Sequence, residues 1–208
     1  MDQKKITEAY DSSVGQYIEN CYNELDYKPL DRQLLDRFSE LTKNKGKICD
    51  IGCGPGHTTK YLSSKGGEAI GIDISGNMIK EAKRLNPDID FRVDNMFETK
   101  FPDAYFAGIC SFYAIVNFNY KEITYAAREY FRLLNNNGLL LAAFHVGEKE
   151  IKVDDFFMSG KPLDFYYFDE NRILQILKET GFKILEALVR FPYEREYPSK
   201  RAYIFAEK

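Results

Sequence analysis

The chain of 208 residues lacks any hydrophobic run long enough to form a membrane-spanning helix. Its first residues, MDQKKITE, lack the apolar core of a secretory signal peptide. Lysine and arginine are not gathered into a basic run, and the formal net charge is only −3. These absences argue against a nucleic acid or a membrane surface as the partner, and we expect a cytoplasmic protein.

Cysteine is also sparse and forms no Cys-x-x-Cys pair. The four cysteines are Cys21, Cys49, Cys53 and Cys110. We therefore expect free thiols and no disulfide framework. We expect no metal site either, because the adjacent acids at 154–155 stand without supporting ligands and are typical of a solvated turn.

A further absence concerns the glycine-rich segment KICDIGCGPGHTT at 47–59. A short apolar run ends in Asp50, and a turn with the spacing Gly-x-Gly-x-Gly follows. The third glycine of the dinucleotide-binding fingerprint is missing, since His57 stands at its position. Glycines let a ligand approach the backbone, and the next helix offers free N–H groups. The segment predicts a strand, loop and helix for a nucleotide-like ligand, and Asp50 favours a cationic amine over a pyrophosphate.

The run from Asp50 to Gly56 resembles the first motif of the class I S-adenosylmethionine-dependent methyltransferases, because the acid, the glycines and the preceding strand all match. The resemblance covers roughly residues 47–206. It implies S-adenosylmethionine as cofactor and S-adenosylhomocysteine as product. It also implies a seven-stranded sheet of order 3-2-1-4-5-7-6, with the last strand antiparallel. The alternative is a tight turn around a buried acid.

The alternation of helix and strand after residue 47 predicts an α/β fold with a doubly wound, Rossmann-like sheet. Asparagines at 135–137 are expected to stop the helix that precedes a fifth strand at 139–145. We predict one methyltransferase domain. Its parts are an N-terminal helical cap (1–46), a cofactor-binding core (47–146), a lid insertion (147–168), and a C-terminal helix and hairpin (169–208).

Two further acids follow predicted strands. Asp73 lies about twenty residues beyond the loop, where a carboxylate can bind ribose hydroxyls, although capping of the next helix is the alternative. The resemblance implies that Asp94 accepts a hydrogen bond from the adenine amine, with a loop-capping turn as the alternative. The other cofactor-binding residues that we expect are Asp50, Gly52, Cys53, Gly54, Gly56, Ile74, Met78, Asn95, Met96, Ser111 and Phe112.

Tyr10 and Tyr17 lie at helical spacing in the N-terminal cap. The resemblance implies that such tyrosines cover the methionine end of the cofactor. Packing against the second cap helix is an equally good interpretation, because tyrosine serves both roles.

The insertion at 147–168 interrupts the helix–strand pattern and is rich in aromatic residues. Insertions beside strand tips commonly select the substrate, although a hairpin that packs over the sheet edge is the alternative. We expect the insertion and the N-terminal helices to form the acceptor site together. The candidate substrate residues are Tyr113, Phe157, Tyr166 and Tyr167.

The leading hypothesis is in-line methyl transfer to a small-molecule acceptor, catalysed by a monomer or homodimer. No Asn-Pro-Pro-Tyr motif follows the fourth strand, which argues against a nucleobase or amide acceptor. His145, at the predicted tip of the fifth strand, is the candidate general base, or else a histidine bonded to the backbone. The alternatives are an NAD(P)-dependent oxidoreductase and a regulatory protein that binds the cofactor without turnover.

Overall fold

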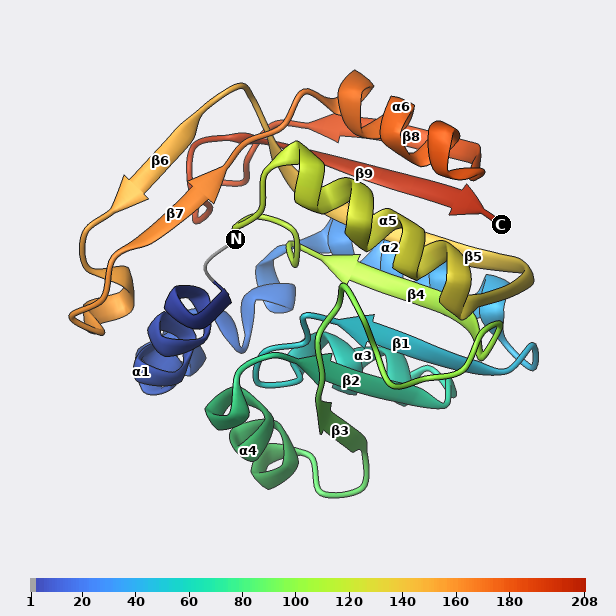
Figure 1. Ribbon diagram of the computed structural model, residues 1–208. Coiled ribbons are helices and arrows are strands. Elements are labelled where there is room, and N and C mark those ends of the chain that lie inside the picture. Colours follow the sequence, from blue (N-terminus) through green and yellow to red (C-terminus); the bar gives the residue numbers. More distant parts are fainter. Residues whose placement is uncertain (1–2) are drawn as a thin grey trace.

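The structure is a computed structural model that describes residues 3–208, so the first two residues of the predicted cap lie outside it. Seven strands form the central sheet. They are β1 (Lys47–Ile51), β2 (Ala69–Asp73), β3 (Asp90–Val93), β4 (Phe106–Phe112), β5 (Leu134–Val146), β8 (Lys183–Arg190) and β9 (Lys200–Glu207). Their order is β3-β2-β1-β4-β5-β9-β8, and β9 is antiparallel to both of its neighbours (Figure 1). This arrangement confirms the predicted fold class and strand order.

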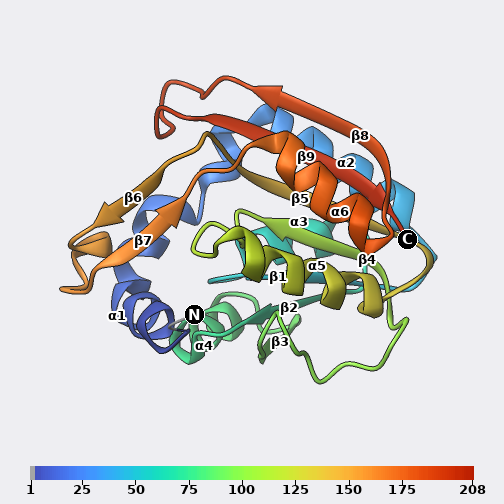
Figure 2. The same ribbon diagram turned by 45° about the horizontal axis from the view of Figure 1, so that its top comes forward.

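Helices cover both faces of the sheet. The α-helices are α1 (Gln3–Cys21), α2 (Pro29–Thr42), α3 (His57–Ser64), α4 (Gly76–Leu85), α5 (Tyr120–Leu133) and α6 (Glu170–Thr180). Helices α5 and α6 lie over one face, and α2 and α3 over the other (Figures 1 and 2). Strands β4 and β5 are buried along most of their length, as unbroken apolar runs between two helical layers require. No helix within residues 3–208 has the length and apolarity needed to cross a membrane.

Local sequence explains where several helices begin and end. The Ser75 hydroxyl accepts a hydrogen bond from the Met78 N–H and caps α4. Asp169 caps α6 in the same way, and Gly181 ends that helix with a φ of 114°. These caps fix the ends of helices that pack directly against the sheet.

The predicted boundary at 135–137 is wrong. Helix α5 ends earlier, at Leu133, and the asparagines belong to an extended segment that continues directly into β5. The backbone reason lies at the far end of the chain. The Asn137 N–H donates to the Lys208 carbonyl, and the Lys208 N–H donates to the Gly138 carbonyl. The C-terminus therefore pairs with this segment, a long-range partner that the local sequence does not reveal.

The insertion folds as a two-stranded hairpin of β6 (Glu150–Val153) and β7 (Leu163–Tyr166), with the short 3-10 helix η2 (Phe156–Met158) between them. Helix α1 packs against this hairpin and against α4 (Figures 1 and 2). Phe156 and Leu163 pack with Ala9 of α1 in a small buried hydrophobic cluster that is separate from the main core. The N-terminal helix and the hairpin thus form one layer beside the strand tips.

Candidate functional site

The glycine loop between β1 and α3 needs glycine for two separate reasons. Gly52, Gly54 and Gly56 have φ values of 72°, 52° and 84°, which side chains disfavour. A Cβ on Gly52 would lie 2.6 Å from the Cβ of Ala114, and one on Gly56 would lie 2.6 Å from the Phe91 ring. A Cβ on Gly54 would meet only one atom of residues 3–208 within 4 Å, a ring carbon of Tyr17 at 3.8 Å. The loop therefore leaves open backbone at Gly54, where a ligand can approach.

Asp73 at the end of β2 holds this loop in place. Its Oδ2 accepts a hydrogen bond of 2.9 Å from the Gly54 N–H, and its Oδ1 accepts one of 2.8 Å from the Ser75 N–H. Burial raises the pKa of Asp73, while these backbone hydrogen bonds act in the opposite direction. Ser75, not Asp73, supplies the side chain that caps α4. A carboxylate has further acceptor capacity, so Asp73 can also bind ligand hydroxyls.

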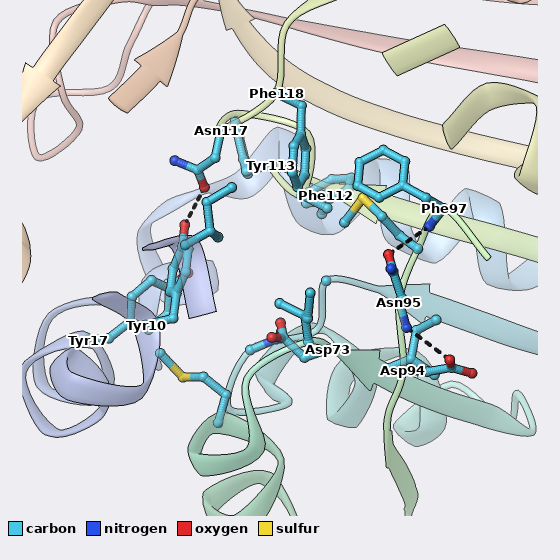
Figure 3. Close-up of a pocket in the computed structure, with 18 residues that line it drawn as sticks. Tyr10, Tyr17, Asp73, Asp94, Asn95, Phe97, Phe112, Tyr113, Asn117 and Phe118 are labelled. Atoms are coloured by element: carbon cyan, nitrogen blue, oxygen red, sulfur yellow. Dashed lines mark hydrogen bonds between the residues drawn. The ribbon is translucent and has the colours of Figure 1, made fainter. Parts of the chain in front are cut away.

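A cavity opens between the glycine loop, the tips of β2, β3 and β4, and helix α1 (Figure 3). Most of the predicted cofactor-binding residues line it: Tyr10, Tyr17, Gly52, Gly54, Asp73, Ile74, Met78, Asp94, Asn95, Met96 and Phe112. Prediction missed Ile6, Ile72, Phe97, Ala114, Asn117 and Phe118. For the residues at 114–118, the position directly after the end of β4 could have indicated a place in the site. We name this space the cofactor cavity.

The residues after β3 are shaped by local hydrogen bonds. Asp94 Oδ1 accepts from the Asn95 N–H at 2.9 Å, and its Oδ2 accepts from the Lys100 N–H at 3.1 Å. Asn95 Oδ1 accepts from the Phe97 N–H at 3.1 Å. The loop-capping interpretation of Asp94 therefore describes its contacts, and Asp94 also lines the cofactor cavity.

The structure places four predicted cofactor residues away from the cavity lining. Asp50 is 2% exposed, and its Oδ2 accepts a hydrogen bond of 2.6 Å from the Thr59 hydroxyl. Burial raises the pKa of Asp50 to about 6. Gly56 is the N-cap of α3 and faces Phe91. Asp50 contacts α3 and Gly56 contacts β3, so both residues support the glycine loop on the side away from the cavity.

The side chains of Cys53 and Ser111 point away from the cofactor cavity and pack against helices instead. The Cys53 side chain is buried among Ile79, Ala82 and Phe91. Ser111 is fully buried, and its hydroxyl lies 3.2 Å from the Tyr130 hydroxyl on α5. Successive residues of a strand face opposite sides of the sheet, so Phe112 reaches the cofactor cavity while Ser111 cannot.

A second cavity, of about 570 Å³, lies beside the first. This volume falls within the range of small-molecule sites. Tyr10, Tyr17 and Tyr113 line both cavities and form their shared wall. The hairpin supplies an apolar side, while the 3-10 helix η1 (Glu24–Tyr27) and the segment at 191–199 supply a charged side. We name this space the acceptor cavity.

Three of the four predicted substrate residues line the acceptor cavity, namely Tyr113, Phe157 and Tyr167. Tyr166 does not, because it faces the other side of β7 from Phe165, which does line the cavity. The Tyr166 N–H instead donates to the Val116 carbonyl at 2.7 Å. Phe165 was missed because a short run of aromatic residues does not indicate which alternate side chains face the cavity.

His145 lies in the wall of the acceptor cavity. Its ring stacks on Tyr167 at 5.3 Å between centroids, and its Nδ1 lies 2.7 Å from the Ser199 hydroxyl. Burial, followed by the charges of Arg201 and Lys28, lowers the pKa of His145 to about 3. The imidazole is therefore neutral near pH 7 and a weak base. Within residues 3–208 no group of three or more His, Cys, Asp or Glu side chains is arranged to hold a metal ion.

Comparison with known proteins agrees with this geometry. Residues 48–138 match the family model described as a methyltransferase domain. An uncharacterized methyltransferase of Alkaliphilus oremlandii is 32% identical over 144 residues, which are 68% of this chain and 65% of the relative. Trans-aconitate 2-methyltransferase of Afipia carboxidovorans is 40% identical over 62 residues, 29% of this chain and 23% of the relative. The chain spans less than two thirds of the length of the curated relatives it matches.

Among solved structures, magnesium protoporphyrin IX methyltransferase from Synechocystis PCC 6803, with bound S-adenosylmethionine, shares the fold. Its TM-score is 0.72 at 18% identity, with 100% of this chain and 98% of that chain covered. The open backbone at Gly54, the carboxylate of Asp73 and the apolar side chain of Met78 fit a nucleoside. Residues 48–138 are therefore identified as a methyltransferase domain, and the chain has the fold of the class I S-adenosylmethionine-dependent methyltransferases.

Proposed function

We propose that the protein transfers a methyl group from S-adenosylmethionine to a small molecule held in the acceptor cavity. The observation that carries this proposal is the wall of Tyr10, Tyr17 and Tyr113, which borders both cavities. Residues common to both cavities place a donor site and an acceptor site side by side, as transfer between two bound molecules requires. Relatives named for trans-aconitate and for magnesium protoporphyrin IX give further support to a small-molecule acceptor.

Each part of the cofactor cavity has a proposed role. Asp73 binds ribose hydroxyls, Asp94 and Asn95 border the adenine, and Met78 packs against it. The cofactor, when bound, supplies a methyl group on a positively charged sulfur, which is already an activated leaving group. The chain's own residues then have to position the acceptor in line and exclude water.

His145 is a poor match for general-base catalysis, because a base works best with a pKa near the working pH. Its pKa of about 3 leaves it neutral but weakly basic. We propose that it positions the acceptor through the stacked Tyr167 ring and its own neutral imidazole.

Two measurements test the proposed function. Calorimetry should show S-adenosylhomocysteine binding more tightly than NAD. Incubation of the protein and S-adenosylmethionine with a metabolite library should form S-adenosylhomocysteine and one methylated product. Tighter NAD binding would favour an oxidoreductase. Cofactor binding without turnover on any library member would favour a regulatory binding protein.

A further inference from the structure

Arg201 on β9 is a buried guanidinium that faces the acceptor cavity with unused hydrogen-bonding capacity. The residue is 3% exposed, and it lines the cavity. Its Nη1 donates to the carbonyls of Tyr197, at 2.8 Å, and Ser199. Its Nε is buried and has no hydrogen-bond partner within the described part of the chain. A buried donor without a partner is costly, and this one therefore suggests a ligand.

The nearest carboxylate does not satisfy this donor. Glu196 Oε1 lies 3.3 Å from the Arg201 Nε, close enough for an ion pair but without hydrogen-bond geometry. Glu196 is instead held by Arg190, whose two nitrogens donate to it at 2.5 and 2.8 Å, and by the Tyr193 N–H at 2.7 Å. Arg201 thus forms an ion pair with Glu196 that leaves its Nε–H without a well-aligned acceptor, and its guanidinium borders the cavity.

The charges around Arg201 leave room for one anion. The ion-paired Asp, Glu, Lys and Arg side chains on this side of the cavity comprise three carboxylates and three cations. They are Glu24, Asp31, Glu196, Lys28, Arg190 and Arg201. His57 Nε2 also lies 3.3 Å from Glu24 Oε1. Arg195, at the cavity, is exposed and forms no ion pair with any residue in 3–208, so it adds a positive charge to the lining of the cavity. One monoanion would balance the set, whereas a phosphomonoester would bring nearly two negative charges.

The opposite side of the cavity is apolar. It is formed by the hairpin and the loop after β4, with Val116, Ile151, Val153, Phe156, Phe157 and Phe165. An occupant that satisfies both sides therefore needs an apolar body and a single negative group at one end. A guanidinium binds a carboxylate with matching planar geometry, which makes a carboxylate the best anion for this end.

We propose that the acceptor is an apolar or aromatic carboxylic acid whose carboxylate is bound by Arg201. Arg195 attracts the acid to the cavity, and the hairpin covers its apolar body. This inference rests on the proposed function, because it describes the occupant of the same acceptor cavity. It assigns Arg201 as the specificity-determining residue.

The test uses the full chain saturated with S-adenosylhomocysteine and a set of acids of increasing length, both aryl-substituted and aliphatic. Each acid is paired with its primary amide and its primary amine, which keep the apolar body but remove the negative charge. By calorimetry, at least one acid should bind about tenfold or more tightly than its amide. If every amide or amine in the set binds as well as its acid, the inference is wrong.

Variants locate the carboxylate. Arg201→Gln should abolish the preference for the acid over the amide, and Arg195→Gln should reduce it by a few-fold and in a salt-dependent way. Arg84→Gln is the matched control, because Arg84 is exposed on α4 and pairs with Glu81. A full preference retained in Arg201→Gln would overturn the assignment, whatever Arg195→Gln shows.

The wild-type acid–amide comparison does not depend on whether Arg201→Gln folds, and S-adenosylhomocysteine affinity reports on the folding of each variant. The two proposals can also fail separately. Tight cofactor binding and methyl transfer without any acid preference would refute the carboxylate inference alone. Absence of cofactor binding would refute the proposed function.

Discussion

Tyr10 on α1 donates a hydrogen bond of 2.9 Å to Asn117 Oδ1 in the loop after β4. Asn117 in turn donates from its Nδ2 to the Asp164 carbonyl of the hairpin at 2.8 Å. Three segments that are distant in sequence therefore meet beside the cofactor cavity, and Figure 3 shows the bond between Tyr10 and Asn117. The Asn117 side chain therefore joins the N-terminal helix, the loop after β4 and the hairpin through two hydrogen bonds, and one substitution can remove the bond to the helix.

Tyr10→Phe should weaken S-adenosylhomocysteine binding. The change keeps the ring that lines both cavities but removes the hydroxyl that bonds Asn117. A hydrogen bond of this kind contributes about 0.5–1.5 kcal/mol, which corresponds to roughly two- to tenfold in affinity. Calorimetry of both proteins measures the difference. Tyr125→Phe, on the exposed face of α5, is the control and should bind normally. Unchanged affinity in Tyr10→Phe would show that the bond serves packing alone.

Asp73→Ala should reduce cofactor affinity by about 100-fold or more while the fold survives. Two hydrogen bonds from ribose hydroxyls to a charged acceptor would be lost, each contributing about 1.5–3 kcal/mol. The Gly54 N–H would lose its partner as well. Affinity is measured by calorimetry, and folding by circular dichroism. Asp90→Ala, which removes an exposed carboxylate paired with Arg92, should bind normally. An affinity for Asp73→Ala within about a factor of two of wild type would contradict the ribose role.

The sheet and the glycine loop could be predicted because their signals are local. The motif around Gly52 and the acid at Asp73 each follow a short buried strand, and parallel strands bring such tips together. Ser111 does not line the cofactor cavity, because its neighbour Phe112 occupies the side of β4 that faces the cavity. A run of residues identifies a strand more readily than it identifies which alternate side chains face inward.

The charged side of the acceptor cavity could not be predicted at all. Lys28 lies on the chain before the first strand, while Glu196 and Arg201 come after the last helix. Each looks like an ordinary surface charge in the sequence, and only the folded chain brings them into one buried cluster. His145 was found from its place at a strand tip, but its low pKa depends on this same distant cluster.

Acidification should destabilise the protein partly through His145. Burial lowers its pKa from the ordinary 6.5 to about 3, so the unfolded chain binds a proton between those values and the folded chain does not. Stability from this group is therefore complete above pH 6.5 and is lost as the pH falls toward 3. Between pH 7 and pH 5 the loss is about 2 kcal/mol.

Urea unfolding of wild type and His145→Gln at pH 7 and pH 5 measures this contribution. The free energy of unfolding of the wild type should fall by about 2 kcal/mol more than that of the variant over this interval. The carboxylates contribute to both proteins and cancel in the comparison. Equal pH dependence in the two proteins would show that His145 titrates normally in the folded state.

Tyr167→Ala should reduce methyl transfer and leave cofactor affinity nearly intact. The Tyr167 ring lines the acceptor cavity and stacks on His145, but it does not line the cofactor cavity. Loss of a ring that positions a bound molecule costs about tenfold or more in rate, because small misplacements weaken in-line attack. The readout is kcat/KM for the acceptor identified in the library, together with the affinity for S-adenosylhomocysteine.

Tyr166→Ala is the matched control for this prediction, because Tyr166, the residue before Tyr167 and the last of β7, has the same side chain but lines neither cavity. Its ring packs against the main core from the other side of the hairpin. We expect a lower melting temperature in Tyr166→Ala with turnover close to wild type, and the reverse in Tyr167→Ala. If the two variants lose turnover equally, the hairpin acts on catalysis through its stability rather than through the side chains that it presents to the acceptor.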